Sequence, residues 1–399
     1  MRRRENVKLL RMRPLWIAAA ILAAVVISVF AFLPRYVETS MNRVRRQGPY
    51  AVSERTRRLM RRIVVADLHA DSLLWGRDLN VRGSRGHLDV PRLIDGGVGL
   101  QAFTIVTQSP RGLNFERNDG NAPDNITLLS LVGLWPPRTW HSHADRATYQ
   151  TQLFNRTVSE SNGKLIPIRT RADLDNYLRL RADRSDVTAG FLGVEGAHAL
   201  DGHMENLDML FDAGVRMMSH THFFDTDMAG AAAGLRKGGL TEKGKELMKR
   251  MEEKRMLIDI AHVSEAAIDD ILATARMPVV SSHTGVKGTC NNSRNLSDRQ
   301  LQGIARTGGV AAIAYFEQAV CGTDVKAVTR AIQYAVKVAG IDYVALGSDY
   351  DGAVEVPFDT TGVGMVLDWL FEAGFTEDQV TRIAGANVVR VLQTVLPPQ

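Results

Sequence analysis

Eight short apolar runs, rich in β-branched residues and each ending on polar residues, follow one another from residue 63 onward. They span residues 63–69, 99–107, 190–195, 215–222, 256–262, 278–283, 309–315 and 343–349. Apolar runs without polar alternation are typical of parallel strands that are covered on both faces. Helical patterns separate several of the runs, so the chain is expected to form an α/β fold, a (β/α)8 barrel, with a doubly wound open sheet as the alternative.

Local signals support helices between these runs. Ser297 with Gln300, and Thr376 with Gln379, match the capping box that begins a helix. Residues 108–165 are too many for a simple loop. We expect helices around 126–135 and 145–158 there, in a position to cover a site at the barrel mouth.

The basic character of the chain belongs to its N-terminal part. Residues 1–62 carry 15 of the 49 lysine and arginine residues but only 3 of the 44 acidic residues. The remainder is therefore mildly acidic. A charge distribution of this kind gives no reason to expect a nucleic-acid partner.

Residues 15–33 form an apolar segment with a single polar side chain, Ser28, between Pro14 and Pro34. At ~1.5 Å per residue the segment spans about 28 Å, close to the hydrocarbon thickness of a bilayer. A cleaved signal peptide has a shorter apolar region and a small-residue cleavage site, so an uncleaved anchor is favoured.

Four segments are expected along the chain. They are a basic tail over 1–13, a transmembrane helix over 14–34, a basic connector over 35–62 and the barrel over 63–399. The connector is expected to be helical over 53–62. It is either a solvated stalk or a contact with anionic headgroups.

Residue types that bind metals recur at the ends of the runs. They are His69, Asp71, Glu195, His222, His262, His283 and Asp349. In a (β/α)8 enzyme the carboxyl ends of the strands form the active site. Carboxylates and imidazoles that converge there would be costly to desolvate without a cation. Mixed ligation suits Zn²⁺, with Mn²⁺, Fe²⁺ or Co²⁺ as alternatives, and a shared carboxylate suggests two ions and metal-assisted hydrolysis.

Five motifs occur in order at these positions. They are D-x-H-x-D at 67–71, G-V-E-G-x-H at 193–198, D-I-A-H-V-S at 259–264, S-H-T at 282–284 with C-x-x-S-R-N at 290–295, and G-S-D-Y-D-G at 347–352. Together they resemble the membrane dipeptidase family, also called renal dipeptidase or peptidase family M19, over about residues 63–394. The resemblance implies a (β/α)8 metal-dependent hydrolase that cleaves dipeptides with two Zn²⁺ ions.

The resemblance also implies roles for single residues. The zinc ligands would be His69 and Asp71 at one ion, His262 and His283 at the other, and Glu195 bridging both. His222 would contact the substrate and stabilise the tetrahedral intermediate. Arg294 would bind the substrate carboxylate, as a guanidinium fork does well. Asp349 would carry a proton to the leaving amine.

Other polar residues near the motifs receive lesser roles. Asp67 is expected to hold an imidazole ring rather than a metal, and Asp351 to be a turn residue. His198 and His220 could equally lie near the substrate or be structural. The remaining histidines are interpreted as loop or surface residues: His87, His141, His143 and His203.

The two cysteines bear on the compartment. Cys290 and Cys321 follow the sixth and seventh runs at one rim, within reach of a disulfide, and family members in oxidising surroundings pair cysteines here. A disulfide requires an oxidising compartment. It would place the N-terminus in the cytoplasm and the barrel outside, periplasmic or extracellular.

The sequence therefore predicts a single-pass, membrane-anchored dipeptidase that acts on dipeptides, with a homodimer allowed. Two alternatives remain at this stage. One is a hydrolase of the same fold that acts on another small amide, such as an N-acyl amino acid. The other is a membrane-tethered binding protein without catalytic activity.

Overall fold

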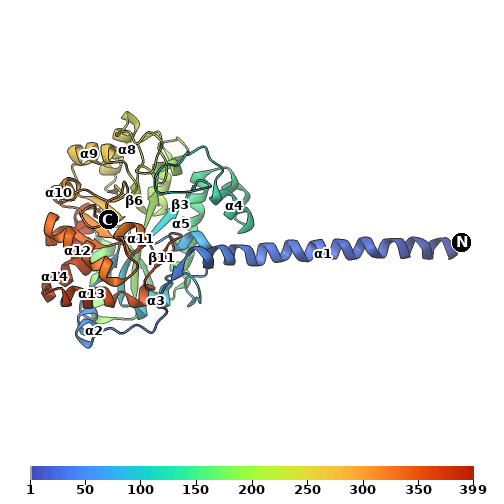
Figure 1. Ribbon diagram of the computed structural model, residues 1–399, viewed down its shortest axis with the longest axis horizontal. Coiled ribbons are helices and arrows are strands. Elements are labelled where there is room, and N and C mark those ends of the chain that lie inside the picture. The colour runs from blue at the N-terminus through green and yellow to red at the C-terminus, as the bar shows by residue number, and fades with distance from the viewer. Residues whose placement is uncertain (1) are drawn as a thin grey trace.

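Eight parallel strands form a closed barrel in the computed structural model, which describes residues 2–399 (Figure 1). The strands are β2 (Val65–Asp67), β3 (Val98–Val106), β5 (Thr188–Glu195), β6 (Val215–Ser219), β7 (Leu257–Asp259), β8 (Val279–Thr284), β9 (Val310–Ile313) and β10 (Val344–Leu346). Each pairs in parallel with its neighbours, and the pairing of β3 with β5 closes the ring. The predicted (β/α)8 barrel is confirmed, and the open sheet is excluded.

The structure adds three strands that the apolar runs did not indicate. β4 (Leu165–Pro167) pairs with the start of β5 outside the ring. The two-residue strands β1 (Arg43–Val44) and β11 (Glu355–Val356) pair with each other in a separate small sheet. These strands are too short to give a periodic signal in the sequence.

Helices surround the barrel and fill the segments between its strands. After α1 they are α2 (Glu54–Met60), α3 (Val90–Asp95), α4 (Asn125–Val132), α5 (His143–Glu160), α6 (Arg171–Asp183), α7 (Asn206–Ala213), α8 (Glu242–Glu253), α9 (Glu265–Thr274), α10 (Asp298–Thr307), α11 (Glu317–Val320), α12 (Val325–Ala339), α13 (Gly364–Glu372), α14 (Glu377–Thr381) and α15 (Asn387–Val395). Both expected capping boxes are present, at the starts of α10 and α14. α4 and α5 match the two helices expected within 108–165.

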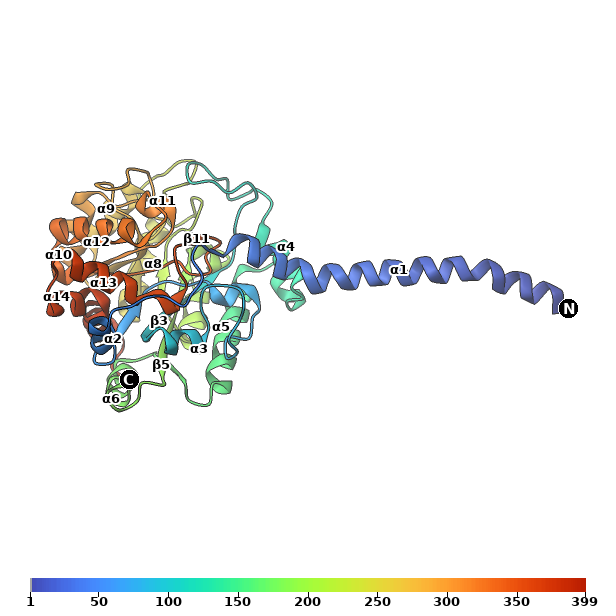
Figure 2. The same ribbon diagram turned by 60° about the horizontal axis from the view of Figure 1, so that its bottom comes forward.

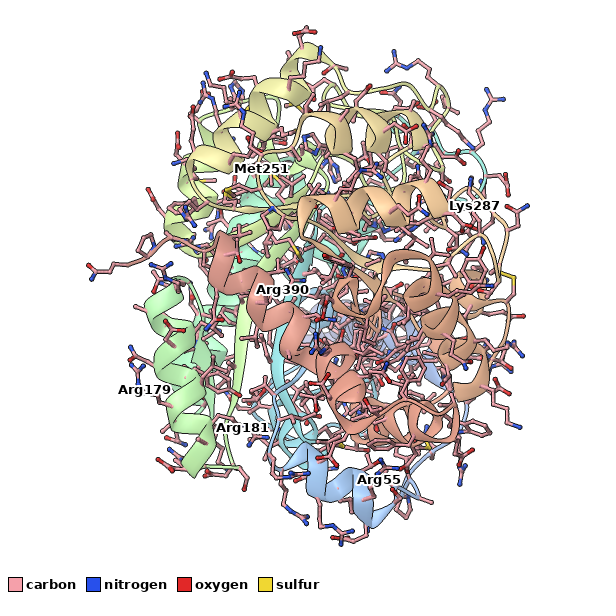
Figure 3. All side chains as sticks on the ribbon, turned by 90° about the vertical axis from the view of Figure 1, so that its left-hand side faces the viewer. Arg55, Arg179, Arg181, Met251, Lys287 and Arg390 are labelled. Atoms are coloured by element: carbon pink, nitrogen blue, oxygen red, sulfur yellow. A yellow bond between two sulfur atoms is a disulfide. The ribbon has the colours of Figure 1, made fainter. Side chains whose placement is uncertain are left out.

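Alternate residues of the strands pack into two apolar clusters. On β9, Ala311 and Ile313 belong to the cluster between strands and surrounding helices, whereas Val310 and Ala312 belong to the other. The second cluster also contains Val391 of α15. Figure 3 shows α15, which carries Arg390, crossing the face of the barrel that is turned away from α1. The strands are therefore buried on both sides, as their continuous apolar character requires.

The N-terminal helix α1 (Arg2–Met41) is longer than the predicted anchor. Its segment Trp16–Met41 is long and apolar enough for a membrane span or a signal sequence. The helix extends away from the barrel in both Figure 1 and Figure 2. Met1, in the predicted tail 1–13, lies outside the described residues, and the side chains of that tail are not described either.

Residues 38–50 lie against the barrel rather than forming a solvated stalk. Glu38 of α1 is 1% exposed and forms ion pairs with Arg77 and Arg85. The next residues pair as β1 with β11, and Tyr50 is buried. The arginine content suggested a solvated segment. The residues that bind this segment to the barrel lie far along the chain, so the local sequence does not reveal the contact.

Candidate metal centre

His69 and Asp71 follow β2 rather than lying within it. The strand ends at Asp67, and Asp71 directly precedes a 3₁₀ turn, so strand alternation does not place these two side chains. Asp67 Oδ1 accepts hydrogen bonds from the backbone N–H groups of His69 (3.1 Å) and Ser348 (2.9 Å). The prediction that Asp67 holds an imidazole is therefore wrong, because its carboxylate fixes the main chain of two strand ends instead.

Glu195, the last residue of β5, lies at the centre of the site. Its Oε1 atom is 3.3 Å from His69 Nε2, 3.3 Å from His262 Nε2 and 3.7 Å from His283 Nε2. His69 Nε2 is in turn 3.5 Å from Asp71 Oδ1. None of these five residues, the three histidines and the two carboxylates, is more than 7% exposed. The structure thus gathers all five predicted ligands around one carboxylate.

The chemistry of these atoms fits metal ions. His69 Nε2 and Glu195 Oε1 are buried and have no hydrogen-bond partner among the described residues. His262 Nε2 and His283 Nε2 face each other at 2.9 Å. Metal-binding side chains form three overlapping groups, and within each group the possible ligand atoms lie within 4.8 Å of one another. The groups are His69, Glu195 and His283; Glu195, His222 and His262; and His69, Asp71 and Asp349. Buried polar atoms without partners are rare, and a cation would satisfy them here.

Burial and charge act differently on the histidines. Burial, with Arg294 nearby, lowers the pKa of His262 well below its usual range, and burial lowers the pKa of His283 as well. Both rings are therefore neutral, the form that binds metals. Burial also opposes charge on His69, but Glu195 and Asp71 outweigh it and raise the pKa of His69 to about 10. The carboxylates thus favour a positive charge at this place.

Asp349 follows β10 in the left-handed region, with φ +64°. Its Oδ1 atom is 3.9 Å from His69 Nε2. Burial raises the pKa of Asp349 well above its usual range; His69 opposes this rise, whereas Asp71 and Glu195 add to it. A carboxyl group beside two other carboxylates can hold a proton at neutral pH and release it to a stronger base.

Polar side chains behind the predicted ligands fix their orientation. Ser282 Oγ lies 3.0 Å from His69 Nδ1 and donates to Asp259 Oδ2 at 2.6 Å. Thr104 Oγ1 donates to Asp71 Oδ1 at 2.6 Å. Such supporting contacts set the tautomer and position of metal ligands. Sequence reasoning missed Ser282, Asp259 and Thr104, although the first two lie inside the motifs.

His222 and Arg294 complete the site. His222 Nε2 is 3.0 Å from Glu195 Oε2, although β6 ends three residues before it. Arg294 is 8% exposed, and its Nη2 donates to the carbonyl oxygen of His283 at 2.9 Å. Both residues line a cavity of about 490 Å³, together with Glu195 and Asp349. A polar centre with a cationic group thus lies within one cavity.

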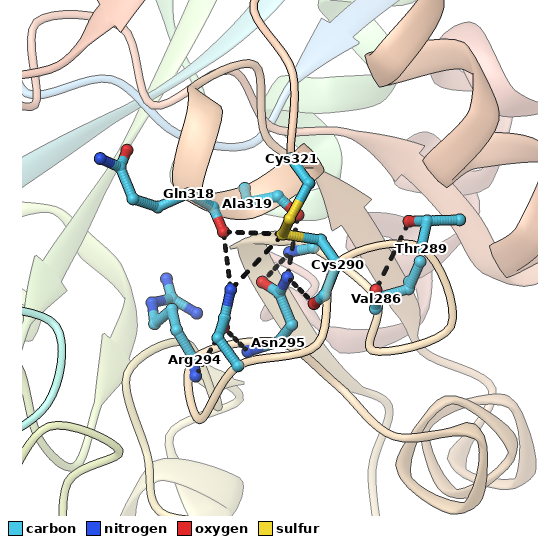
Figure 4. Close-up of a disulfide and its surroundings, with 10 residues drawn as sticks. Val286, Thr289, Cys290, Arg294, Asn295, Gln318, Ala319 and Cys321 are labelled. Carbon is cyan, nitrogen blue, oxygen red and sulfur yellow. Dashed lines mark hydrogen bonds between the residues drawn. A yellow bond between two sulfur atoms is a disulfide. The ribbon is translucent and has the colours of Figure 1, made fainter.

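The predicted disulfide between Cys290 and Cys321 is confirmed, with Cα atoms 5.2 Å apart. It joins the loop that carries Arg294 to the segment after β9 (Figure 4). Asn295 Nδ2 strengthens this junction by donating to the carbonyl oxygens of Cys290 (2.7 Å) and Ala319 (2.9 Å). These contacts restrain the loop on which Arg294 is positioned.

Of the histidines left outside the ligand set, two differ in their surroundings. His220 is buried, and its Nε2 atom contacts the carbonyl oxygen of Gly244 at 3.2 Å, away from the cavity. The ring of His198 packs beside Phe224, with centroids 5.0 Å apart. His141 and His203 are exposed, as expected. His143 is half-buried, with Nδ1 2.9 Å from Asp201 Oδ1.

His87 lies in a loop, as one of the two expectations had it, but not at the surface. The side chain is fully buried, and Nδ1 accepts a hydrogen bond from the backbone N–H of Asp351 at 2.8 Å. Asp351 lies in a turn, with φ +62°, but its carboxylate also accepts from Ser72 Oγ at 2.5 Å and pairs with Arg77. Asp351 therefore ties the loop after β10 to the loop after β2.

Comparisons with known proteins agree with this architecture. The membrane dipeptidase family (peptidase family M19) matches residues 53–396. "Dipeptidase aclJ" of Aspergillus oryzae is 26% identical over 358 residues, which cover 84% of this chain and 79% of that protein. An uncharacterised dipeptidase of Schizosaccharomyces pombe is 27% identical over 322 residues, covering 77% and 72%.

Solved structures share the fold. The probable dipeptidase PvdM from Pseudomonas aeruginosa superposes with a TM-score of 0.71 at 19% identity, over 86% of this chain and 98% of that one. A metallopeptidase from Rhodobacter sphaeroides, bound to a phosphinate mimic of the dipeptide L-Ala-D-Ala, superposes with a TM-score of 0.69 at 21% identity. The superposition covers 84% of this chain and 99% of that one. The family match covers nearly the whole barrel. The chain therefore belongs to the membrane dipeptidase family, peptidase family M19, and is a dipeptidase of this group of metallopeptidases.

Proposed function

We propose that the protein is a membrane-anchored dipeptidase that uses two Zn²⁺ ions. The observation that carries this proposal is the position of Glu195, whose Oε1 atom lies 3.3 Å from both His69 Nε2 and His262 Nε2. A carboxylate between two ligand groups suits a binuclear site. His69 and Asp71 would hold one ion, and His262 and His283 the other.

Zinc in such a site lowers the pKa of a water molecule and polarises the scissile carbonyl group. The protein groups would do the rest. His222 would donate a hydrogen bond to the oxygen that gains negative charge in the transition state. Asp349 would give its proton to the leaving amine. Arg294 would bind the carboxylate of the substrate and align the amide bond.

The substrate is proposed to be a free dipeptide. Arg294 would bind its carboxylate and the metal centre would face its free amino group, and a site that binds both ends restricts the length of the substrate. Another small amide with a free carboxylate, such as an N-acyl amino acid, is the second candidate, since Arg294 would bind it equally well. The alternative of a binding protein without activity is set aside, because the chain belongs to a family of dipeptidases over residues 53–396. A homodimer stays a prediction.

Replacing Arg294 with alanine is expected to raise KM for a free dipeptide at least about 30-fold, since an ionic hydrogen-bonded contact contributes about 2–3 kcal/mol. The same change should matter little for a C-terminally amidated dipeptide, which offers no carboxylate. Steady-state kinetics on both substrates test this expectation. Equal losses on the two would show that Arg294 does not bind the carboxylate.

We also propose that residues 14–34 anchor the protein, with the tail 1–13 cytoplasmic, and that 63–399 form the catalytic barrel outside the cytoplasm. α1 supports the anchor by its length and apolar character. The Cys290–Cys321 disulfide supports the orientation, because stable disulfides belong to oxidising compartments. Residues 35–62 would connect the two parts.

Peptide mapping of the protein from its native membrane, without reduction, is expected to recover Cys290 linked to Cys321. In intact cells from which any outer membrane or cell wall has been removed, an added protease should cleave the catalytic barrel. Two free thiols, together with a barrel that is protected until the cells are lysed, would contradict the proposed orientation.

A further inference from the structure

The cavity at the metal centre continues to the N-terminal helix. The same cavity of about 490 Å³ that is lined by Glu195 and His283 is lined at its outer part by Leu33 and Val37 of α1 and by Leu128 of α4. α1 and α4 meet where α1 leaves the barrel, as Figures 1 and 2 both show. Val37 and Leu129 pack against one small apolar cluster there. We call this outer part the α1–α4 wall.

The α1–α4 wall begins where the apolar segment of α1 ends. Leu33 is the last residue of the apolar run 15–33 and also lines the cavity. If α1 crosses a bilayer, the mouth of the active site therefore lies at the membrane surface.

The end of α1 is fixed to the barrel and is not a loose tether. Glu38 is buried and forms ion pairs with Arg77 and Arg85. Asn42 Oδ1 accepts a hydrogen bond from the backbone N–H of Ala353 at 2.8 Å, in the loop that follows Asp349. Removing one partner of a buried ion pair is strongly destabilising, so this junction holds α1 against the cavity mouth.

The α1–α4 wall continues onto an apolar surface. Leu128 is 48% exposed and Phe115 is 39% exposed, and both line the cavity. Leu134, just beyond α4, is 70% exposed but does not line the cavity. Exposed apolar residues that join a pocket indicate a partner that is itself apolar.

We propose that the α1–α4 wall binds a long hydrocarbon substituent on the dipeptide substrate. The polar end of the substrate lies at the metal centre near Arg294, and its hydrocarbon chain lies along Leu33, Val37 and Leu128. The substrates are thus amphiphilic dipeptides of the kind that concentrate at a membrane surface. This inference rests on the proposed dipeptidase function and adds its substrate class.

A series of Xaa-Ala dipeptides tests the proposal, with alanine, 2-aminohexanoic acid or 2-aminodecanoic acid as Xaa, and a second series with the order reversed. The full-length, zinc-loaded protein is assayed in one detergent concentration throughout. Each methylene that leaves water contributes about a fourfold gain in affinity. In one of the series, kcat/KM should rise at least about 100-fold from the shortest to the longest substrate.

Two matched variants separate the α1–α4 wall from a general surface effect. Leu128→Gln should lower the ratio of kcat/KM for the longest to the shortest substrate by about tenfold or more. Leu134→Gln changes an equally apolar residue outside the cavity and should leave that ratio unchanged. An equal fall in both variants would show partition into detergent or lipid and would overturn the proposal.

The two proposals fail in different ways. Hydrolysis of Ala-Ala with no gain along either series would overturn the hydrocarbon site and leave the dipeptidase intact. No hydrolysis of any member of either series by the zinc-loaded protein would overturn the dipeptidase function, and the substrate class with it.

Discussion

Replacing Glu195 with glutamine is expected to lower kcat/KM for a dipeptide by on the order of 1,000-fold or more. The amide is neutral and offers one oxygen where the carboxylate offers two. Because Glu195 Oε1 lies 3.3 Å from both His69 Nε2 and His262 Nε2, both ligand groups lose their shared negative charge. Because both positions lose a ligand, the total metal content per chain should fall, measured by elemental analysis of the purified variant beside the wild type.

Glu246→Gln is the matched control, because Glu246 is an exposed carboxylate on α8 that pairs only with surface residues. It should keep full activity and full metal content. A Glu195→Gln protein that binds two ions per chain and cleaves dipeptides at the normal rate would contradict the shared role of Glu195.

Replacing Asp349 with asparagine is expected to lower kcat by about 100- to 10,000-fold, the usual contribution of a positioned proton donor. The loss should depend on the leaving amine. An alkyl amine needs a proton to leave, whereas an arylamine such as 4-aminobenzoate needs it much less and still offers Arg294 a carboxylate. The loss of kcat caused by the substitution should therefore be several-fold smaller on an aminoacyl-4-aminobenzoate than on the dipeptide.

Metal content distinguishes the two roles that the geometry allows for Asp349. Its carboxylate lies in one group of ligand atoms with His69 and Asp71. A proton donor can be lost without loss of metal, so the Asp349→Asn protein should keep its metal ions. Lower metal content together with equal losses on both substrates would make Asp349 a ligand instead.

The barrel and the convergence of the proposed ligands could be predicted because they depend on order along the chain. Parallel strands end at one rim, so a metal-binding residue that follows each apolar run must come close to the others. Glu195 and His283 illustrate this, since both lie within strands that the apolar pattern indicates. The structure corrects the local path at His69, Asp71 and His262, which lie beyond their strands.

The unpredicted features depend on partners that are distant in sequence. The burial of His87 follows from Asp351, which lies 264 residues away. The contact of Asp259 with Ser282 and the burial of Glu38 against Arg77 arise in the same way. Residue type alone predicts exposure for such charged groups, because charged side chains are rarely buried without a partner. Only the folded chain shows the partner.

The most direct test of the account is metal removal and return on the purified full-length protein. We expect about two Zn²⁺ ions per chain and hydrolysis of a dipeptide such as Ala-Ala. A chelator should abolish that activity, and added Zn²⁺ should restore it with a stoichiometry near two. A chelated, metal-free protein that retains full activity on the dipeptide would contradict the metal centre at Glu195 and the mechanism built on it.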